Sequence, residues 1–460
     1  MGKTLEQRFE EYSAVVVKAL AHADRVIPAR WYLRGLMLPG QRKSIEPMAA
    51  RVHPADVRSA HQSMHHLVAD ADWSDTALLA AVAHHVVPAL NKRDDGSCFW
   101  IIDDTGFRKY GKHSVGVTRQ YCGQLGKTEN CQVAVSLSLA TRAGSLPLAW
   151  RLYLPRAWAD DKPRRAQAGV PPDIAFATKG ELARAQIETA LAAAYPRGTV
   201  LMDAGYGDEA ALRDWLTAHD LSYAVGVRPQ TAVWWAEHQP VIPTGKQHRG
   251  RPRTRVQRDP KHRPISVAEL AQTLPARRYR TVTWREGTNG SLRSRFARVR
   301  VRTAQADRAR GEEWLLIEWP AGETEPTRYF LSTLPEDISF KALVDTVKMR
   351  WRIELDYREL KQELGLGHYE GRNWRGFHHH ASLCIAAYGF LMRERLSGIK
   401  KNTARLKTPA VPKRFRPRGA GTNAAPRSVV DRQRALSSRP GHRAYSDRVS
   451  VLRKATRVAK

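Results

Sequence analysis

Apolar residues recur at helical spacing through the first 95 residues of the chain. Four segments place them three and four positions apart: residues 5–23, 44–50, 56–68 and 75–87. This spacing gives a helix one apolar face. The segments are separated by Pro28, Pro39, Pro54 and Pro88, and proline commonly interrupts a helix. We therefore predict a helical N-terminal domain over residues 1–95.

From Phe99 the pattern changes to that of β-strands alternating with helices. Apolar runs at residues 99–104, 132–139 and 146–154 predict three strands. A helix at 179–194, a strand at 199–203, a helix at 208–219 and a strand at 223–227 follow. This is the order of elements in an RNase H-like fold, although other α/β folds share it. We predict an α/β chain whose RNase H-like core begins with residues 96–228.

The chain between Asp203 and Glu354 is longer than the end of such a core requires. Alternating apolar and polar residues at 279–301 and 313–333 predict strands there. We therefore expect a β-rich inserted domain over residues 229–335, entered through a basic loop at 245–264. Residues 336–396 would return to the core as closing helices. Residues 397–460 contain few apolar positions, which predicts a disordered basic tail.

Charge points to the class of partner. The 460 residues carry a formal net charge of +31, with a pI near 10.4. Such an excess favours a polyanion, and we expect double-stranded DNA. A membrane partner is not expected, because no apolar run reaches the roughly 18 residues of a membrane span and the N-terminus is charged. These features predict a cytoplasmic protein.

Three carboxylates stand at positions that would suit a metal site. Asp103 and Asp203 follow apolar strand-like runs, and burying such charges without a partner is unfavourable. Helical spacing places Glu354 on one face with Arg350 and Lys361, within roughly 40° of each other. Carboxylate oxygens suit hard divalent cations. The pattern predicts one metal site flanked by cations that could hold phosphates.

These residues carry a family resemblance. The order Asp103, Asp203, Glu354 resembles the DDE transposases of bacterial insertion sequences, in particular those with the helical signature Tyr-x2-Arg-x3-Glu-x6-Lys. Arg350 and Lys361 fit the signature, whereas Val347 stands where the tyrosine would be. The missing tyrosine hydroxyl would affect one phosphate contact and not the metal site.

Further motifs resemble the insertion sequence 701 family. They are collinear from about residue 33 to about residue 391 and comprise residues 42–49 (RKSIEPMA), 104–107 (DTGF), 111–117 (GKHSVGV), 120–123 (QYCG) and 368–372 (HYEGR). The resemblance implies a bacterial, nucleoid-associated transposase that cuts the ends of an insertion sequence and joins them to target DNA. It also implies two Mg²⁺ or Mn²⁺ ions held by Asp103, Asp203 and Glu354, and a homodimer in the DNA complex.

Several assignments remain open on sequence alone. Both faces of the strand before Asp103 and Asp104 are apolar, so alternation does not select the ligand; the family pattern favours Asp103, with Asp104 as the alternative. Trp351 either stacks on a DNA base or packs in the core. A catalytically inactive DNA-binding repressor derived from a transposase and an RNase H-like nuclease are the alternative functions.

Basic residues outside the acidic site are predicted DNA contacts. Lys109 and Lys112 follow the first acid and are placed to meet phosphates, as are Arg350 and Lys361. Arg249 and Arg251 belong to an Arg-Gly-Arg-Pro sequence, a type that can enter a narrow minor groove. The alternative is a solvated basic loop. The N-terminal helices either bind DNA or serve only for packing.

Overall fold

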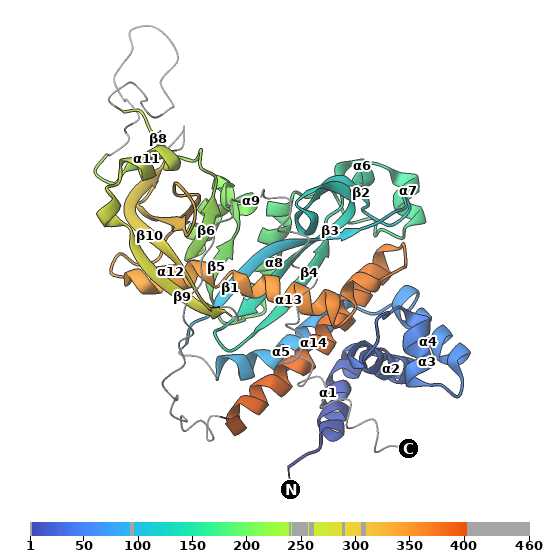
Figure 1. Cartoon of the computed structure of the whole chain (residues 1–460). Coiled ribbons are helices and arrows are strands. Elements are labelled where there is room, and N and C mark those ends of the chain that lie inside the picture. Colours follow the sequence, from blue (N-terminus) through green and yellow to red (C-terminus); the bar gives the residue numbers. More distant parts are fainter. Residues whose placement is uncertain are drawn as a thin grey trace, which may run out of the picture.

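The computed structural model describes the chain as a mixed α/β protein in which helices pack on one large sheet (Figure 1). It describes residues 2–92, 96–238, 241, 256, 262–287, 290–304 and 310–402, with only the backbone for 399–402. Within these residues, no helix is both long enough and apolar enough to cross a membrane.

The predicted helices of the N-terminal segment are present, together with one more. They are α1 (Leu5–Ala19), η1 (Ala23–Arg25), α2 (Val26–Met37), α3 (Ile45–Val52), α4 (Val57–Ala69) and α5 (Asp75–Asn91). The first helix ends before residue 23, because Ala21 adopts a positive φ of 57°. Helix α2 was not predicted; its Pro28 lies in the first turn, where no backbone N–H is needed. The prediction that Pro88 ends a helix was also wrong, since it lies inside α5.

The predicted core strands and helices follow in the predicted order, with additions. The elements are β1 (Phe99–Arg108), β2 (Thr118–Cys122), η2 (Gly123–Leu125), β3 (Lys127–Ala140), β4 (Ser145–Leu152), α6 (Arg156–Ala159), α7 (Lys162–Gln167), α8 (Lys179–Ala192), β5 (Thr199–Met202), α9 (Ala204–Gly207), α10 (Ala210–Ala218) and β6 (Tyr223–Val227). Strand β1 is antiparallel to β3 and parallel to β5, and β5 is parallel to β6. Strand β4 pairs with β3, so the spatial order is β4-β3-β1-β5-β6.

The strands of the inserted segment continue this same sheet. They are β7 (Ala232–Trp235), β8 (Ile265–Ser266), β9 (Arg280–Gly287), β10 (Gly290–Thr303), β11 (Glu313–Pro320) and β12 (Arg328–Ser332), with α11 (Val267–Thr273) and η3 (Ala276–Arg278) between them. The predicted runs at 279–301 and 313–333 form β9 to β12, whereas β7 and β8 were not predicted. Strand β12 pairs antiparallel with β6, with Leu331 opposite Val225. Among the described residues, twelve strands thereby form one sheet.

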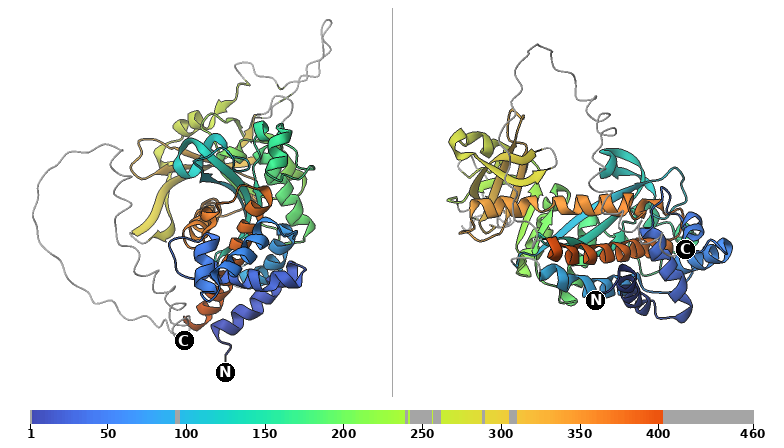
Figure 2. Two further views of the ribbon diagram at one scale, coloured as in Figure 1. Left: turned by 90° about the vertical axis from the view of Figure 1, so that its right-hand side faces the viewer. Right: turned by 60° about the horizontal axis from the view of Figure 1, so that its bottom comes forward.

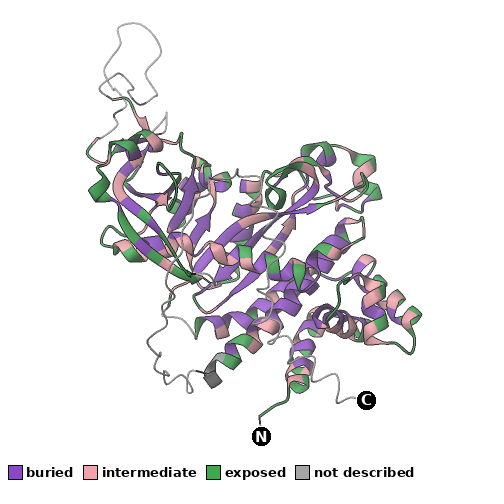
Figure 3. Ribbon diagram, viewed as in Figure 1, coloured by how far each residue is buried: buried purple, intermediate pink, exposed green. Residues whose placement is uncertain are grey.

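Two long helices after the insertion cross one face of the core sheet (Figures 1 and 2). The closing elements are α12 (Phe340–Lys348), α13 (Trp351–Gln362), η4 (Leu366–His368) and α14 (Trp374–Asn402). Helix α8 covers the opposite face, where Gln186 donates to the carbonyl of Val135 on β3 at 3.0 Å. Both faces of β1 are therefore covered, which explains why Phe99 to Ile102 are all buried (Figure 3).

Candidate functional site

Asp103 lies near the middle of β1, opposite Ser136 of β3. Its Oδ1 accepts a hydrogen bond from the Asp104 backbone N–H at 2.8 Å, and its side chain is 14% exposed. Because successive strand residues face opposite sides, Asp103 points toward α13 and Asp104 points toward α8. The strand thus separates two neighbouring acids that the sequence pattern could not distinguish.

Asp203 stands at the end of β5, the strand parallel to β1. It is the N-cap residue of α9, and its Oδ1 accepts from the Gly205 N–H at 2.9 Å. Gly205 leaves little room here, because an added Cβ would stand 3.1 Å from that oxygen. The parallel ends of β1 and β5 therefore bring Asp103 and Asp203 to the same edge of the core.

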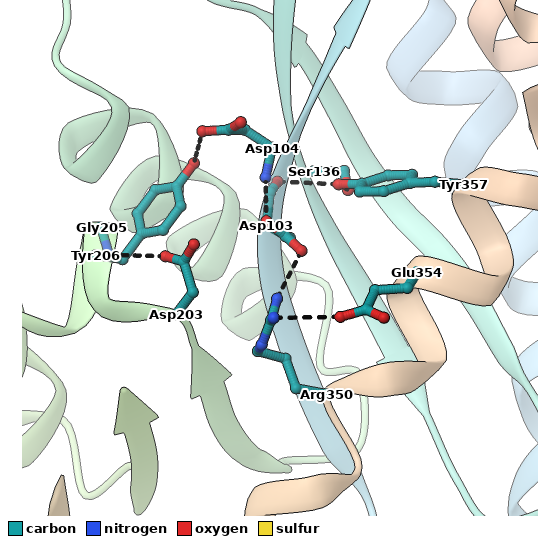
Figure 4. Close-up of polar contacts among 9 residues, drawn as sticks. All are labelled: Asp103, Asp104, Ser136, Asp203, Gly205, Tyr206, Arg350, Glu354 and Tyr357. Carbon is teal, nitrogen blue, oxygen red and sulfur yellow. Dashed lines mark hydrogen bonds and ion pairs between the residues drawn. The ribbon is translucent and has the colours of Figure 1, made fainter. Parts of the chain in front are cut away.

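Arg350 joins two of the predicted acids. It immediately precedes α13, and its guanidinium donates to Asp103 Oδ2 at 2.8 Å and to Glu354 Oε1 at 3.3 Å (Figure 4). Glu354 lies one turn into α13, with 65% of its side chain exposed, whereas Arg350 is 29% exposed. The helix thus holds an arginine between a buried strand acid and a more open helix acid.

Electrostatics link these groups. Burial raises the pKa of the Asp103 carboxyl to about 7; Arg350 opposes this rise, and the charges of Asp203 and Asp104 add to it. For Arg350, burial lowers the pKa, but Asp103, Asp203 and Glu354 outweigh it, so the net direction is upward. Three carboxylates therefore act on one guanidinium, so the cluster can stabilise further positive charge.

The donor set fits a hard divalent cation in its chemistry. Within the described residues, no group of three or more His, Cys, Asp or Glu side chains is gathered closely enough to hold a metal ion. Instead, the Arg350 guanidinium occupies the position between Asp103 and Glu354. Carboxylate oxygens are the ligands preferred by Mg²⁺ and Mn²⁺, and a guanidinium bridging two of them marks a place where positive charge is stabilised.

Asp104, the alternative first acid, is engaged elsewhere. Its Oδ2 lies 2.7 Å from Lys179 Nζ of α8 and accepts from the Tyr206 hydroxyl at 3.5 Å. Both Asp104 and Lys179 are largely covered, at 20% and 33% side-chain exposure. Asp104 therefore has its own cation on the far face of β1, while Asp103 shares one with Glu354.

Tyr357 is a site residue that sequence reasoning missed. Its hydroxyl donates to the backbone carbonyl of Asp103 at 3.0 Å and lies 2.8 Å from Ser136 Oγ. The ring is buried, which raises the pKa of the phenol. Tyr357 follows Glu354 by three positions on α13, so helical spacing could have placed both on one side. For Lys179, no local pattern gave a signal.

The predicted DNA contacts divide into three groups. Lys361 donates to the Gly106 carbonyl at 2.7 Å and to Gln124 Oε1 at 2.8 Å, and burial lowers the pKa of its ammonium to about 8. Lys109 donates to the Tyr369 carbonyl at 2.9 Å. Lys361 thus holds the backbone of β1 beyond Asp103, and Lys109 holds the backbone that follows η4.

Lys112 is exposed, and its contact with a phosphate stays a prediction. The ring of Trp351 is half-buried, with the Arg285 guanidinium 3.8 Å above its centroid. One face of that ring is therefore already covered by a cation. Arg249 and Arg251 lie outside the described residues. Of the tail predicted at 397–460, residues 397–402 continue α14, and residues 403–460 lie outside the described residues.

Comparisons with known proteins show similarity to a nuclease family and to a transposase. The model of the family described as DDE superfamily endonuclease matches residues 15–291, a stretch that contains Asp103 and Asp203 and ends before Glu354. The protein named probable transposase for insertion sequence element IS701, from Microchaete diplosiphon, is 30% identical over 170 residues. That match covers 36% of this chain and 40% of the relative.

Proposed function

Because the chain belongs to the DDE superfamily of endonucleases, we propose that it is an insertion-sequence transposase that cuts the ends of its element and joins them to target DNA. The observation that carries this proposal is the arrangement of Asp103 and Glu354 around Arg350, with Asp203 on the adjacent parallel strand. The name of the IS701 relative supports the same activity. In this assignment Asp103, Asp203 and Glu354 are the metal ligands, and Asp104 is not.

The proposed architecture follows from the family. We assign residues 96–228 and 336–396 to an RNase H-like core, which the strand order β4-β3-β1-β5-β6 supports. Residues 1–95 form the helical domain and residues 229–335 the inserted domain. The inserted strands extend the core sheet through β12, so they stand beside the acids and can present DNA to them.

The chemistry expected is in-line displacement at a DNA phosphodiester. Two bound Mg²⁺ or Mn²⁺ ions would stabilise the attacking and leaving oxygens. Asp103, Asp203 and Glu354 would hold these ions by carboxylate oxygens. Arg350 keeps Asp103 and Glu354 oriented, and Tyr357 fixes the backbone of Asp103. The same acids can then serve two reactions. In cleavage, water attacks the phosphodiester; in joining, the 3′-hydroxyl of the cut end attacks a phosphodiester of the target DNA.

Two further proposals concern assembly and location. Joining both ends of an element to one target requires two active sites held together, so we expect two protomers to pair two ends. The charge of +31 favours retention on DNA, and we place the protein in the bacterial cytoplasm, on the nucleoid. End cleavage by mixtures of wild-type protein and the Glu354→Ala variant tests the pairing. Cleavage confined to a monomer bound to one end would contradict it.

The test of the activity uses duplexes carrying the inverted repeats that flank the gene. Wild-type protein should nick and join them with Mg²⁺ or Mn²⁺. Asp103→Ala, Asp203→Ala and Glu354→Ala should each abolish both reactions while leaving DNA binding nearly intact, because each removes a metal ligand. Full activity of Glu354→Ala would refute the assignment.

The two alternative functions give different results in the same assay. A repressor would bind the repeats without cutting them under any metal condition. An RNase H-like nuclease would cut but leave no joined product. The intact set of three acids argues against the first alternative, and the IS701 relative argues against the second.

A further inference from the structure

A cavity of about 670 Å³ lies between the N-terminal helices and the core, away from the acids. Three stretches that carried the sequence resemblance meet in its wall, although they are far apart along the chain: residues 42–47, His113 and residues 368–372. Residues of α2, α4, α6, α7 and α14 also line it, and we name it the α3–α7 pocket. The proposed metal chemistry gives these motifs no role.

The floor of the α3–α7 pocket is fixed by buried polar contacts. The Lys43 N–H donates to His368 Nδ1 at 3.1 Å, and its ammonium donates to the carbonyls of Leu36 and Glu363. The Tyr32 hydroxyl lies 2.7 Å from His380 Nδ1. Since these contacts join α2, the loop before α3 and α14, the cavity is formed in advance rather than on binding.

One acid of the wall is paired with a cation. Arg42 forms an ion pair with Glu370 at 2.5 Å, and its charge also interacts with that of Glu46. Asp70 lies 3.7 Å from the imidazole of His65. The charge of Glu370 is thus balanced within the protein.

The positively charged side chains at the rim of the pocket have fewer partners. Among the described residues, the exposed Arg372 guanidinium has no hydrogen-bond or ion-pair partner. Arg164 is held in place by stacking 3.7 Å from the centroid of Trp158 and by donating to the Lys112 carbonyl at 2.7 Å, which leaves the rest of its guanidinium available. Helix α3 also begins at this wall, and Ser44 gives it no side-chain cap. Together these groups favour an anion.

The pocket is connected to the acids by two elements. Strand β1 carries Asp103 and leads to His113, and α13 carries Glu354 and leads to His368. From Asp103 to Arg108 the strand covers about 17 Å at ~3.3 Å per residue, and α13 advances about 12 Å from Glu354 to Gln362 at ~1.5 Å per residue. The hydrogen bond from Lys109 to Tyr369 ties the two elements together at this end.

We propose that the α3–α7 pocket binds one nucleotide unit of a DNA strand whose scissile phosphate lies at the acids, with its phosphate at Arg372 and Arg164. This inference rests on the proposed function. The roughly 17 Å that β1 covers from Asp103 to Arg108 corresponds to about five nucleotides at ~3.4 Å each, and the pocket lies beyond Arg108 along the chain. The cavity lies within the roughly 300–1,000 Å³ of ligand pockets, more than a lone phosphate contact needs, so the sugar and base of that nucleotide enter with the phosphate.

The experiment measures DNA affinity by fluorescence anisotropy across salt concentrations and maps protected phosphates by ethylation interference on the element-end duplex. For Arg372→Ala we expect about tenfold weaker binding, a log–log salt slope smaller by about one, and loss of interference about five or more nucleotides from the cleavage position. Arg164→Ala should do the same. Arg184→Ala is the matched control, because that exposed arginine on α8 pairs with Glu188 and lies outside the pocket wall.

Thermal unfolding of each variant distinguishes a lost contact from a lost fold, and Arg372→Lys should restore most of the affinity. Unchanged affinity and interference in both alanine variants would overturn the proposal. So would binding of free deoxynucleoside monophosphate that is lost in Arg372→Ala while duplex binding is retained, because the ligand would then be a free nucleotide. If wild-type protein never cuts DNA but the interference depends on Arg372, the transposase assignment fails and the pocket remains a DNA site.

Discussion

The two ends of the β1–α13 pair have opposite charge balance. At the acid end, the carboxylates of Asp103, Asp203 and Glu354 share one guanidinium. At the pocket end, Arg42 pairs with Glu370, and Arg372 is left without a partner among the described residues. One end is therefore suited to metal ions and the other to phosphate. The difference would fix the direction in which a DNA strand lies along the two elements.

The largest expected effect separates the two faces of β1 at the acid end. Asp103→Asn should lower end cleavage at least 10³-fold, equivalent to about 4 kcal/mol of transition-state stabilisation. Asp104→Asn should lower it less than tenfold, because it removes only a partly exposed ion pair with Lys179. Single-turnover cleavage rates of both variants provide the measurement. A reversal of this order would make Asp104 the ligand.

Removing the guanidinium at the acid end should be the next largest effect. Arg350→Met leaves Asp103 without its ion-pair partner, which should cost about 3 kcal/mol in the free energy of unfolding without metal. Added Mg²⁺ should recover more stability in this variant than in wild type, because the ion replaces the lost positive charge.

Urea titrations with and without Mg²⁺ provide the measurement, and Arg358→Met, an exposed arginine on the same helix, is the control. Equal stabilisation of wild type and the Arg350→Met variant by Mg²⁺ would argue against a cation site at these acids.

Acid should lower the stability of the pocket end through His380. Burial lowers the pKa of His380 to about 4, and Lys109 and His368 contribute further. The unfolded chain, with an ordinary histidine pKa near 6.5, therefore takes up the proton first, so stability is lost as pH falls from about 6.5 to about 4. Between pH 7 and pH 5 we expect a loss of about 2 kcal/mol from this residue.

Urea unfolding at the two pH values provides the measurement. In the His380→Gln variant the pH dependence should be smaller by that amount, because the titrating group is gone. Identical pH dependence in the variant and the wild type would show that the histidine does not control the stability of this end.

The smallest expected effect concerns the link between the inserted strands and the acid end. Arg285→Ala removes the cation stacked on Trp351, which should lower stability by about 0.5–1 kcal/mol. Cleavage should change less than threefold, because no acid loses a partner. Thermal unfolding and cleavage rates of Arg285→Ala, compared with Arg293→Ala on the same hairpin, test this. A larger loss of cleavage would mean that the stack orients α13.

The element order of the core and the separation of its acids were predictable, because each depends on local period. Side chains repeat their direction every two residues in a strand and every 3.6 residues in a helix. The apolar runs before Asp103 and Asp203 could therefore be recognised from the local residue pattern. The helical face of Arg350 and Glu354 could be derived in the same way. Their direct hydrogen bond agrees with that spacing.

The remaining features depend on contacts between distant segments. Alternation could not orient Asp103 and Asp104, because both faces of β1 are buried; Lys179 of α8 and Arg350 distinguish them, and neither is local. Helix α2 was missed because Pro28 was taken as an interruption rather than a first-turn residue. The α3–α7 pocket combines segments more than 300 positions apart, which no local period can indicate.

The pairing of β6 with β12 has a consequence for how the chain is made. Strand β6 ends at Val227, but its partner begins at Arg328, so about one hundred residues must leave the ribosome before that edge is covered. At ~5–20 residues per second, the growing core exposes an open strand edge for roughly 5–20 s. Open edges invite pairing with other chains, so the nascent protein should depend on chaperone protection until β12 arrives.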